Sequence, residues 1–419
     1  MIPMLTPQGL QIGVVNINNK TIRLMKMNLN NPAFLQSAGN AQANDYFYIT
    51  SRVDGNELSF ATGLLGVFAD NVQYSLNSTN DWEQLTKDVV ITLDAQETVY
   101  FRNRTGVVNT NGGINLLGIT DEFDAGGNIM RLFYPGQSDV PANGLDELFK
   151  ELPIVSAGEL KLPATVLSNS CYSSMFYGCT SLTAAPELPA TVLSNSCYNY
   201  MFYGCTSLTA APELPATVLS HSCYNYMFSG CTSLTAAPEL PATALAEYCY
   251  SNMFYGCTSL TAAPELPATA LANSCYISMF SECTSLTAAP KLPATALANF
   301  CYSNMFSECT SLTAAPELPA TALANSCYSS MFYGCTSLTA ASELPATALA
   351  EYCYNYMFYG CTSLTAVTCL ATDISADNCV DGWLDGVAET GVFTKSADME
   401  DWSEGASGIP TGWTVQDNA

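Results

Sequence analysis

A 26-residue repeat governs most of this 419-residue chain. The first copy, LPATVLSNSCYSSMFYGCTSLTAAPE, begins at Leu162, and eight copies fill residues 162–369 with almost no insertions. A fixed period in this range is typical of a solenoid, in which each unit stacks only on its neighbours. We therefore expect eight stacked coils rather than the two or three globular domains that the length alone would favour.

Each repeat contains two patterns that predict two kinds of secondary structure. In AxLxxxCYxxMFxGC, apolar residues recur every four positions, as on one face of an amphipathic helix. In the first copy these residues are Leu167, Cys171, Met175 and Cys179, with Phe176 beside them. The segment SLTAAPEL is too short for a helix and predicts a brief strand or extended turn near residues 182–185, ended by Pro186. The sequence thus predicts a mixed α/β solenoid.

The chain has 18 cysteines, and sixteen of them fall in two columns at the repeat period, which begin at Cys171 and Cys179. Cys379 extends the first column and Cys369 lies outside both. We interpret them as small apolar core residues. Disulfides are disfavoured, because eight helical residues span ~12 Å and neighbouring helices lie ~8–10 Å apart. The spacing of the cysteines does not favour zinc, so we expect no metal and no cofactor.

The composition disfavours several classes of function. With 12 basic and 37 acidic residues the net charge is −25, which would repel nucleic acid. No uninterrupted apolar run reaches the ~18 residues that membrane insertion requires. The single histidine, His221, replaces Asn or Glu of other repeats and is interpreted as a surface substitution. No pair of carboxylates is singled out for hydrolysis, so we expect no enzyme and no catalytic residues.

The repeats vary mainly at positions outside the apolar pattern, where Tyr, Asn and Ser alternate. Two interpretations fit these positions: a free surface that tolerates any polar residue, or an adaptable binding surface on one face of the solenoid. For the face as a whole we favour binding. The candidate residues are Tyr177, Tyr200, Tyr203, Tyr226, Tyr248, Tyr255, Tyr333, Tyr352, Tyr356 and Tyr359.

Two sets of acidic residues also follow a regular spacing. One column has the members Glu187, Glu213, Glu239, Glu265, Lys291, Glu317 and Glu343. Stacked like charges repel, and a bound cation would relieve this, but Lys291 interrupts the column, so solvated surface glutamates are favoured. The second set is Asp373, Asp377, Asp381 and Asp385. No ion-binding loop pattern accompanies them, so acidic loop residues are favoured over a calcium site.

The segments that flank the repeats predict further domains. Residues 45–110 contain strand-like runs such as DVVITLDA and predict a small β-sandwich. Residues 111–161 are expected to connect this domain to the first coil and to cap it. Residues 370–419 leave the period, carry three of the four tryptophans and are expected to form the C-terminal cap. Residues 1–44 are interpreted as an N-terminal arm or attachment segment.

The unit CYxxMFxGCTSLTAAPELPATxLA resembles leucine-rich repeats found in surface proteins of Bacteroides-type gut bacteria and in their phages. The upstream stretch VQYSLNSTNDWEQLTKDVVITLDAQETVYFRNRTG and the closing WLDGVAETGVFTKSADMEDWSEGASGIPTGWTV resemble the β-domain and the cap that accompany such repeats. The resemblance covers about residues 45–419. It implies a right-handed solenoid of the leucine-rich-repeat type with short strands on one face, a role in adhesion or recognition, and no catalytic residues.

The start of the sequence shows no secretory signal, since no apolar run precedes the first basic residue, Lys20. A phage protein needs no export, and assembly in the cytoplasm suits sixteen or more reduced thiols. We therefore expect a virion protein (a head fibre, a capsid decoration or a tail-associated protein). Its N-terminal region would bind capsid or tail proteins and form a homotrimer, and its solenoid would bind host surface glycans or proteins. The alternatives are a bacterial cell-surface adhesin and a solenoid enzyme acting on polysaccharide.

Overall fold

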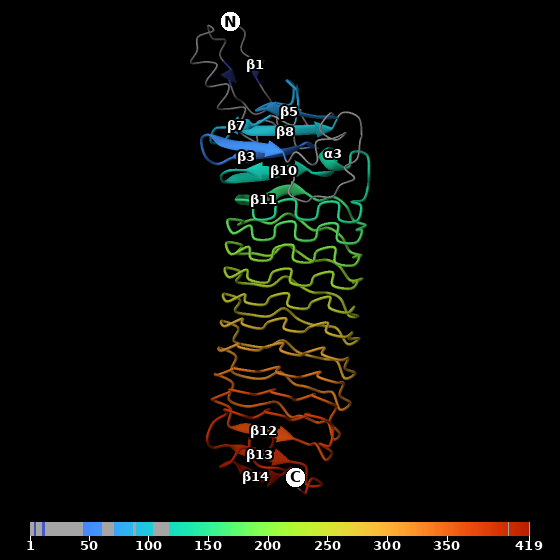
Figure 1. Ribbon diagram of the computed structural model, residues 1–419, viewed down its shortest axis with the longest axis vertical. Helices are drawn as coiled ribbons and strands as arrows, with labels where there is room; N and C mark the ends of the chain where they lie inside the picture. Colours follow the sequence, from blue (N-terminus) through green and yellow to red (C-terminus); the bar gives the residue numbers. More distant parts are fainter. Residues whose placement is uncertain are drawn as a thin grey trace.

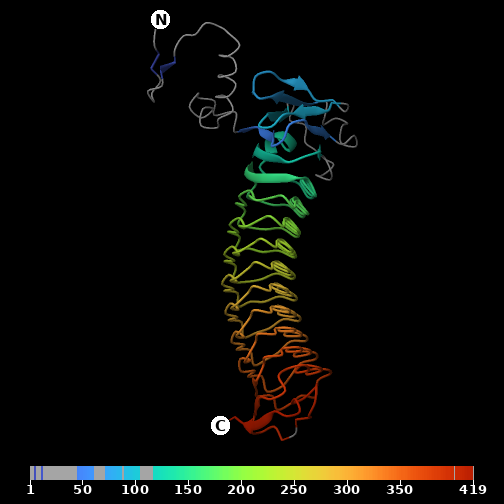
Figure 2. The same cartoon turned by 90° about the vertical axis from the view of Figure 1, so that its left-hand side faces the viewer.

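The computed structural model is a gently curved rod with a β-rich head at one end and a small sheet at the other (Figures 1 and 2). It describes residues 45–60, 71–86, 89–103, 117–400 and 402–418, and the backbone of two short antiparallel strands, β1 (Met4–Leu5) and β2 (Gln11–Ile12). The predicted N-terminal arm at 1–44 otherwise lies outside the described residues. Among the described helices, none has the length and apolar character needed to cross a bilayer.

The head consists of two sheets. The larger has the order β11-β10-β3-β8-β5-β6, with β3 at Phe47–Ser51, β5 at Val72–Leu76, β6 at Glu83–Gln84, β8 at Thr98–Asn103, β10 at Phe123–Asn128 and β11 at Ile154–Lys161. The smaller has the order β7-β4-β9, with β4 at Asn56–Phe60, β7 at Ile91–Leu93 and β9 at Leu117–Ile119. Buried residues alternate along β3 and β4, and Phe60 packs edge-on against Phe101 at 5.4 Å, so the two sheets share one core.

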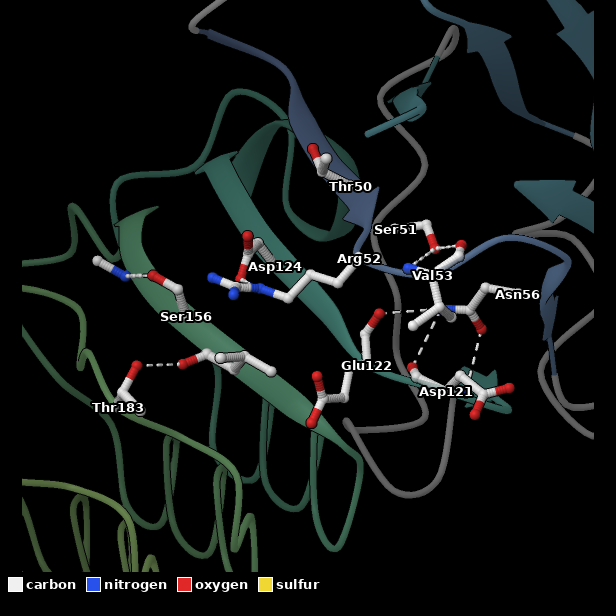
Figure 3. A network of polar contacts seen from close by, with 12 residues as sticks. Thr50, Ser51, Arg52, Val53, Asn56, Asp121, Glu122, Asp124, Ser156 and Thr183 are labelled. Atoms are coloured by element: carbon white, nitrogen blue, oxygen red, sulfur yellow. Dashed lines mark hydrogen bonds and ion pairs between the residues drawn. The ribbon is translucent and has the colours of Figure 1, made fainter. Parts of the chain in front are cut away.

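Polar contacts, some buried and one exposed, fix the passage from the smaller sheet to the larger (Figure 3). The Asn56 amide nitrogen donates to the carbonyl oxygens of Asp121 and Glu122, both at 3.1 Å, and its oxygen accepts the Asp121 backbone N–H at 3.0 Å. The side chain of Arg52 donates to Asp124 on β10 at 2.9 Å. Because Asn56 is only 2% exposed, its amide replaces the water that the turn between β9 and β10 would otherwise need.

The head and the solenoid are joined by a continuous ladder of backbone hydrogen bonds. Strand β10 pairs in parallel with β11, and β11 in turn contacts the first repeat. Ala157 donates to the Ala184 carbonyl and Thr183 donates to the Val155 carbonyl, both at 2.8 Å. The junction between the head and the first coil therefore has no exposed sheet edge, and the apolar core runs from the head into the coils.

The repeats contain no helix, so the expected mixed α/β character is wrong. The one helix of the described residues, α3 (Met130–Phe133), lies in the head. The segment predicted to be helical is instead a chain of overlapping β-turns, which we call the turn ribbon; it covers residues 168–179 and their equivalents in each coil. The residues expected on the apolar helical face are nevertheless buried, since Cys171, Met175, Phe176 and Cys179 are all 0% exposed.

The turn ribbon has a left-handed residue at every fourth position. In the second coil these are Ser196, Tyr200 and Gly204, with φ of 53°, 54° and 68°. Each is the third residue of a four-residue turn closed by a backbone hydrogen bond, such as Met201 N–H to Tyr198 C=O at 3.2 Å. A positive φ at the third position is the geometry of a type II turn. The spacing of four therefore reports one type II turn every four residues, not one helical face.

Alternate amides of the turn ribbon point along the rod and tie the coils together. Tyr198, Tyr200 and Phe202 donate to carbonyls of the third coil at 2.9–3.0 Å, while the intervening Asn199 and Met201 donate within their own coil at 3.2 Å. Every backbone amide along this stretch is thereby paired, as a buried backbone requires. This register brings equivalent side chains of successive coils into contact.

Equivalent aromatic rings stack in two buried columns. The tyrosines that follow the first cysteine, from Tyr172 to Tyr354, are at most 1% exposed and stack with centroids 5.7–6.2 Å apart. The phenylalanines from Phe176 to Phe358 stack at 5.4–5.8 Å. All 18 cysteines are free and buried, which confirms their interpretation as core residues. In the second column each thiol donates to a phenylalanine carbonyl, as Cys205 does to Phe176 at 3.1 Å.

Layers of the same kind extend beyond the repeats at both ends. Before them, Leu145 and Phe149 donate to carbonyls of the first coil, and Phe149 stacks on Phe176 at 5.3 Å. After them, residues 373–385 accept hydrogen bonds from the eighth coil, so the turn ribbon continues for one layer past the last recognisable repeat. The segments expected only to join and cap the solenoid thus build its outermost layers.

A three-stranded parallel sheet closes the C-terminal end. It has the order β12-β13-β14, with β12 at Ala366–Cys369, β13 at Val392–Lys395 and β14 at Thr414–Asp417. The strand predicted near residues 182–185 of each repeat is one isolated bridge in the first coil, Ser156 with Ala184, and one in the seventh, Ala340 with Ala366. It forms part of β12 in the eighth coil, and the second to sixth coils, which are all described, have no bridge at this position. Trp383 covers the end of the tyrosine column at 6.1 Å from Tyr354 and is covered in turn by Trp402 at 5.6 Å.

Candidate binding surface

The ten tyrosines predicted to form a binding face all reach solvent, unlike those of the buried column. Tyr248, Tyr352 and Tyr356 are 41%, 43% and 39% exposed, and the other seven are partly buried. The turn ribbon explains the difference. Along the turn ribbon two adjacent residues point inward and the next two point outward, so that Tyr198 is buried and Tyr200 faces solvent.

Four of the tyrosines form one contiguous group in the first three coils, which we call the first tyrosine cluster: Tyr177, Tyr200, Tyr203 and Tyr226. Tyr177 and Tyr203 stack with centroids 4.8 Å apart, and Tyr200 and Tyr226 stack at 4.7 Å. The two stacks meet through Tyr200 and Tyr203, whose rings are tilted at 5.6 Å. Partial burial, and then the neighbouring phenols, raise the pKa of Tyr200, so its hydroxyl remains a hydrogen-bond donor.

The stacking determines which parts of these rings a ligand can reach. Each ring in a parallel pair loses one face to its partner, and the outer face of Tyr177 lies under the Lys150 ammonium at 5.3 Å. What the first tyrosine cluster presents is therefore a row of ring edges and phenol hydroxyls on a rigid backbone. Such a row offers donors, acceptors and apolar contact at low cost in side-chain entropy.

A second group lies in the last two coils and contains Tyr333, Tyr356 and Tyr359. Tyr333 stacks on Tyr359 at 5.0 Å, and Tyr356 meets Tyr359 edge-on at 5.8 Å. We call these three residues the second tyrosine cluster.

Acidic residues separate the two clusters. In coils five and six the glycine of the turn ribbon is replaced by Glu282 and Glu308, which keep positive φ of 62° and 59°. Tyr255 donates to the Glu282 carboxylate, and this hydrogen bond, together with burial, raises the pKa of Tyr255 to about 12. The tyrosine face predicted from the sequence is thus divided into two phenolic patches with a negatively charged interval.

The remaining two candidates are not part of either cluster. Tyr248 and Tyr352 precede the first cysteine of their coils, in the same column as the exposed Phe300. Tyr248 meets His221 edge-on at 5.6 Å. Phe300 and the valines at 166, 192 and 218 are also exposed but were not among the predicted residues, although the change from Val to Ala after the third repeat was a visible signal.

The buried thiols are poor nucleophiles. Burial raises the pKa of Cys171 and of Cys231 to about 12, so the reactive thiolate is scarce near neutral pH. Within the described residues no group of three His, Cys, Asp or Glu side chains is arranged to hold a metal ion. Of the spaced aspartates, Asp373 accepts the Ser375 backbone N–H at 3.0 Å and Asp381 accepts the Ser407 hydroxyl at 2.9 Å.

Comparison with known protein families agrees with the repeat. The sequence profile of the BspA type leucine rich repeat region matches six copies, over residues 156–287, 195–338 and 278–378. The chain belongs to this family. The profile covers more than half of the sequence and confirms the resemblance to leucine-rich repeats. No curated protein matches the chain significantly. BspA-type repeats support a surface protein of the adhesion type.

Proposed function

We propose that the protein is a non-enzymatic adhesion protein whose solenoid binds host-surface molecules through its tyrosine clusters. The first tyrosine cluster is the observation that carries this proposal, because four partly exposed rings are held in fixed contact on the hydrogen-bonded turn ribbon. Exposed aromatic groups of this density are enriched in binding sites and uncommon on inert surfaces.

The geometry favours a protein ligand over a glycan. Binding of sugars to tyrosine uses open ring faces, whereas the parallel stacking at 4.7–4.8 Å covers the inner faces of both pairs. Ring edges and hydroxyls suit the mixed polar and apolar surface of a protein. The overall charge of −25 argues against nucleic acid and anionic membrane as partners.

The setting that we propose is a phage virion, with the N-terminal region bound to capsid or tail proteins and with three copies joined there. Eighteen free, buried thiols support assembly in a reducing compartment, as in a cytoplasm where virions form. The alternative setting is the bacterial cell surface, which the family favours. Peptide mass spectrometry of gradient-purified particles beside the host outer-membrane fraction separates the two. Peptides confined to the envelope would contradict the virion proposal.

The adhesion proposal is tested by substituting the clusters separately. We expect Tyr177→Ser with Y200S, Y203S and Y226S to lower binding to host cells at least tenfold, because the variant removes every ring of the first tyrosine cluster. The matched control is Y333S with Y356S and Y359S, which changes the second tyrosine cluster alone. Circular dichroism checks that both variants remain folded. Unchanged binding in both would contradict the tyrosine face as the binding surface.

A further inference from the structure

A row of hollows runs along the rod where each coil passes into the next. They follow the sequence Ala-Ala-Pro-Glu-Leu-Pro, which is residues 184–189 in the first coil, and we call this row the proline groove. From the head outward the hollows measure about 420, 560, 410 and 270 Å³. Neighbouring hollows share lining residues, such as Glu213 and Pro215, so they form one groove across successive coils.

The backbone of the proline groove is unpaired. Where the second coil passes into the third, residues 210–216 are all described and make no backbone hydrogen bond, whereas every amide of residues 196–205 in the turn ribbon donates one. Pro212 and Pro215 explain this, because each lacks an N–H group and neither can donate to a ladder. The groove therefore offers free amide and carbonyl groups beside the proline rings.

Both ends of the proline groove are closed by hydrogen bonds. At the head, Ala157 donates to Ala184. At the other end Ser342 replaces the first proline, and there Ala341 donates to Ala366 at 3.0 Å and Leu344 to Thr368 at 2.9 Å. At the head the bonded partner is strand β11, which contains no proline. The ladder thus forms beside a segment without this proline at both ends, which indicates that the prolines keep the intervening coils open.

Charge is the second property of the proline groove. Glu187, Glu213, Glu239 and Glu265 are exposed along it, and none takes part in the ion pairs found among the described residues. Successive coils place these carboxylates ~4.8 Å apart, a spacing at which like charges repel. A cationic ligand lying along the groove would relieve the repulsion over four coils.

We propose that the proline groove binds an extended basic segment of a partner protein, with Lys or Arg at every third residue. In a polyproline II conformation three residues advance ~9.3 Å, close to the ~9.6 Å that separates glutamates two coils apart. A β-strand places same-side residues ~6.8 Å apart and matches neither one coil nor two. An α-helix has its backbone groups already paired and would leave those of the groove unused. This site is independent of the tyrosine clusters.

The test uses the full chain and a labelled peptide of four Lys-Ala-Pro triplets, measured by fluorescence anisotropy. We expect the peptide to bind and E187Q with E213Q, E239Q and E265Q to weaken it at least tenfold. The charge-matched control changes four exposed glutamates outside the groove, Glu247, Glu282, Glu308 and Glu351, to Gln and should weaken it less than threefold. Circular dichroism and thermal unfolding check that both variants keep the fold.

Several results would overturn the proposal. Equal weakening by both variants would mean that net charge, not the groove, attracts the peptide. Equal affinity for a peptide with its four lysines in succession would contradict the three-residue spacing. A higher affinity in K20Q with R23Q and K26Q would mean that the chain's own basic segment occupies the groove instead of a partner. Substituting the first tyrosine cluster should leave peptide binding unchanged, so this test and that of the tyrosine clusters fail separately.

Discussion

Replacing Phe254 by alanine probes the stacked core at its centre. Phe254 is 0% exposed and lies between Phe228 at 5.7 Å and Phe280 at 5.6 Å, with all three rings parallel to within 5°. Alanine removes the ring and therefore both of its stacking contacts, with Phe228 and with Phe280. The adjacent coils cannot collapse to fill the space, because the hydrogen bonds of the turn ribbon fix their separation.

The expected cost follows from these contacts. Truncation of a buried phenylalanine destabilises a protein by about 3–5 kcal/mol, and a parallel ring pair adds about 0.5–1.5 kcal/mol beyond its burial. The truncation range already includes lost ring contacts, so the two pairs of Phe254 place it in the upper part of that range. We expect a loss of about 4–5 kcal/mol in the free energy of unfolding, measured by urea titration. Phe254→Leu should cost less than Phe254→Ala, about 1–3 kcal/mol, because leucine keeps most of the apolar volume but loses both ring pairs.

A surface substitution provides the baseline for this experiment. Val218 is 52% exposed, so Val218→Ala should change the free energy of unfolding by less than about 0.5 kcal/mol. If Phe254→Ala costs no more than Val218→Ala, the ring does not fill the core and the stacked column is wrong. If unfolding occurs in more than one step, hydrogen exchange of the turn-ribbon amides shows which coils have lost stability.

Three further perturbations test the repeat, the ribbon and the thiols. Deleting residues 266–291 removes one full period, and we expect a folded, shorter rod; loss of cooperative unfolding or of solubility would count against independent coils. Glu282→Gly should raise stability by roughly 1 kcal/mol in urea titration, since φ is 62° there; a destabilised variant would show that the Tyr255 hydrogen bond outweighs the backbone strain. Burial raises the pKa of Cys171 from 9.0 to about 12. The contribution of this thiol to the free energy of unfolding is therefore complete below pH 9 and is lost as pH rises toward 12, at about 1.4 kcal/mol per pH unit for each such thiol. Unfolding curves that do not change over this range would contradict thiol burial.

Much of the architecture could be predicted from the repeat alone. The period gives the number of coils, the columns of identical residues and the inward position of Cys171 and Met175, because stacking forces equivalent residues into equivalent environments. The ten exposed tyrosines could be chosen by the same logic, since they vary where the core residues do not.

The four-residue spacing itself argues against the helix that was predicted in each repeat. Four residues turn a helix by about 400°, so a strict spacing of four drifts by about 40° each time and leaves the buried face within three repeats. A ribbon with one type II turn every four residues has no such drift. The small or polar residue that recurs at the third turn position, such as Ser170 and Gly178, was the local sign of a positive φ.

The division of the tyrosines into two clusters could not be predicted in this way. Contact between Tyr177 and Tyr200 depends on the staggered register in which an amide bonds to a residue 25 positions ahead in the next coil. Contact between Tyr200 and Tyr203 depends on the path of the turn ribbon within one coil. The unpaired backbone of the proline groove likewise depends on which coils pair, although the exchange of Pro for Ser342 hinted at it.

The way in which the coils are bonded has a mechanical consequence. Each coil holds only its two neighbours, through the short hydrogen bonds of the turn ribbon and one ring in each aromatic column. A pulling force applied at the ends would therefore release coils one at a time. Each release would lengthen the tether by about 85 Å of chain, against ~4.8 Å of rod, and an attached particle would feel a series of yields instead of one sudden break.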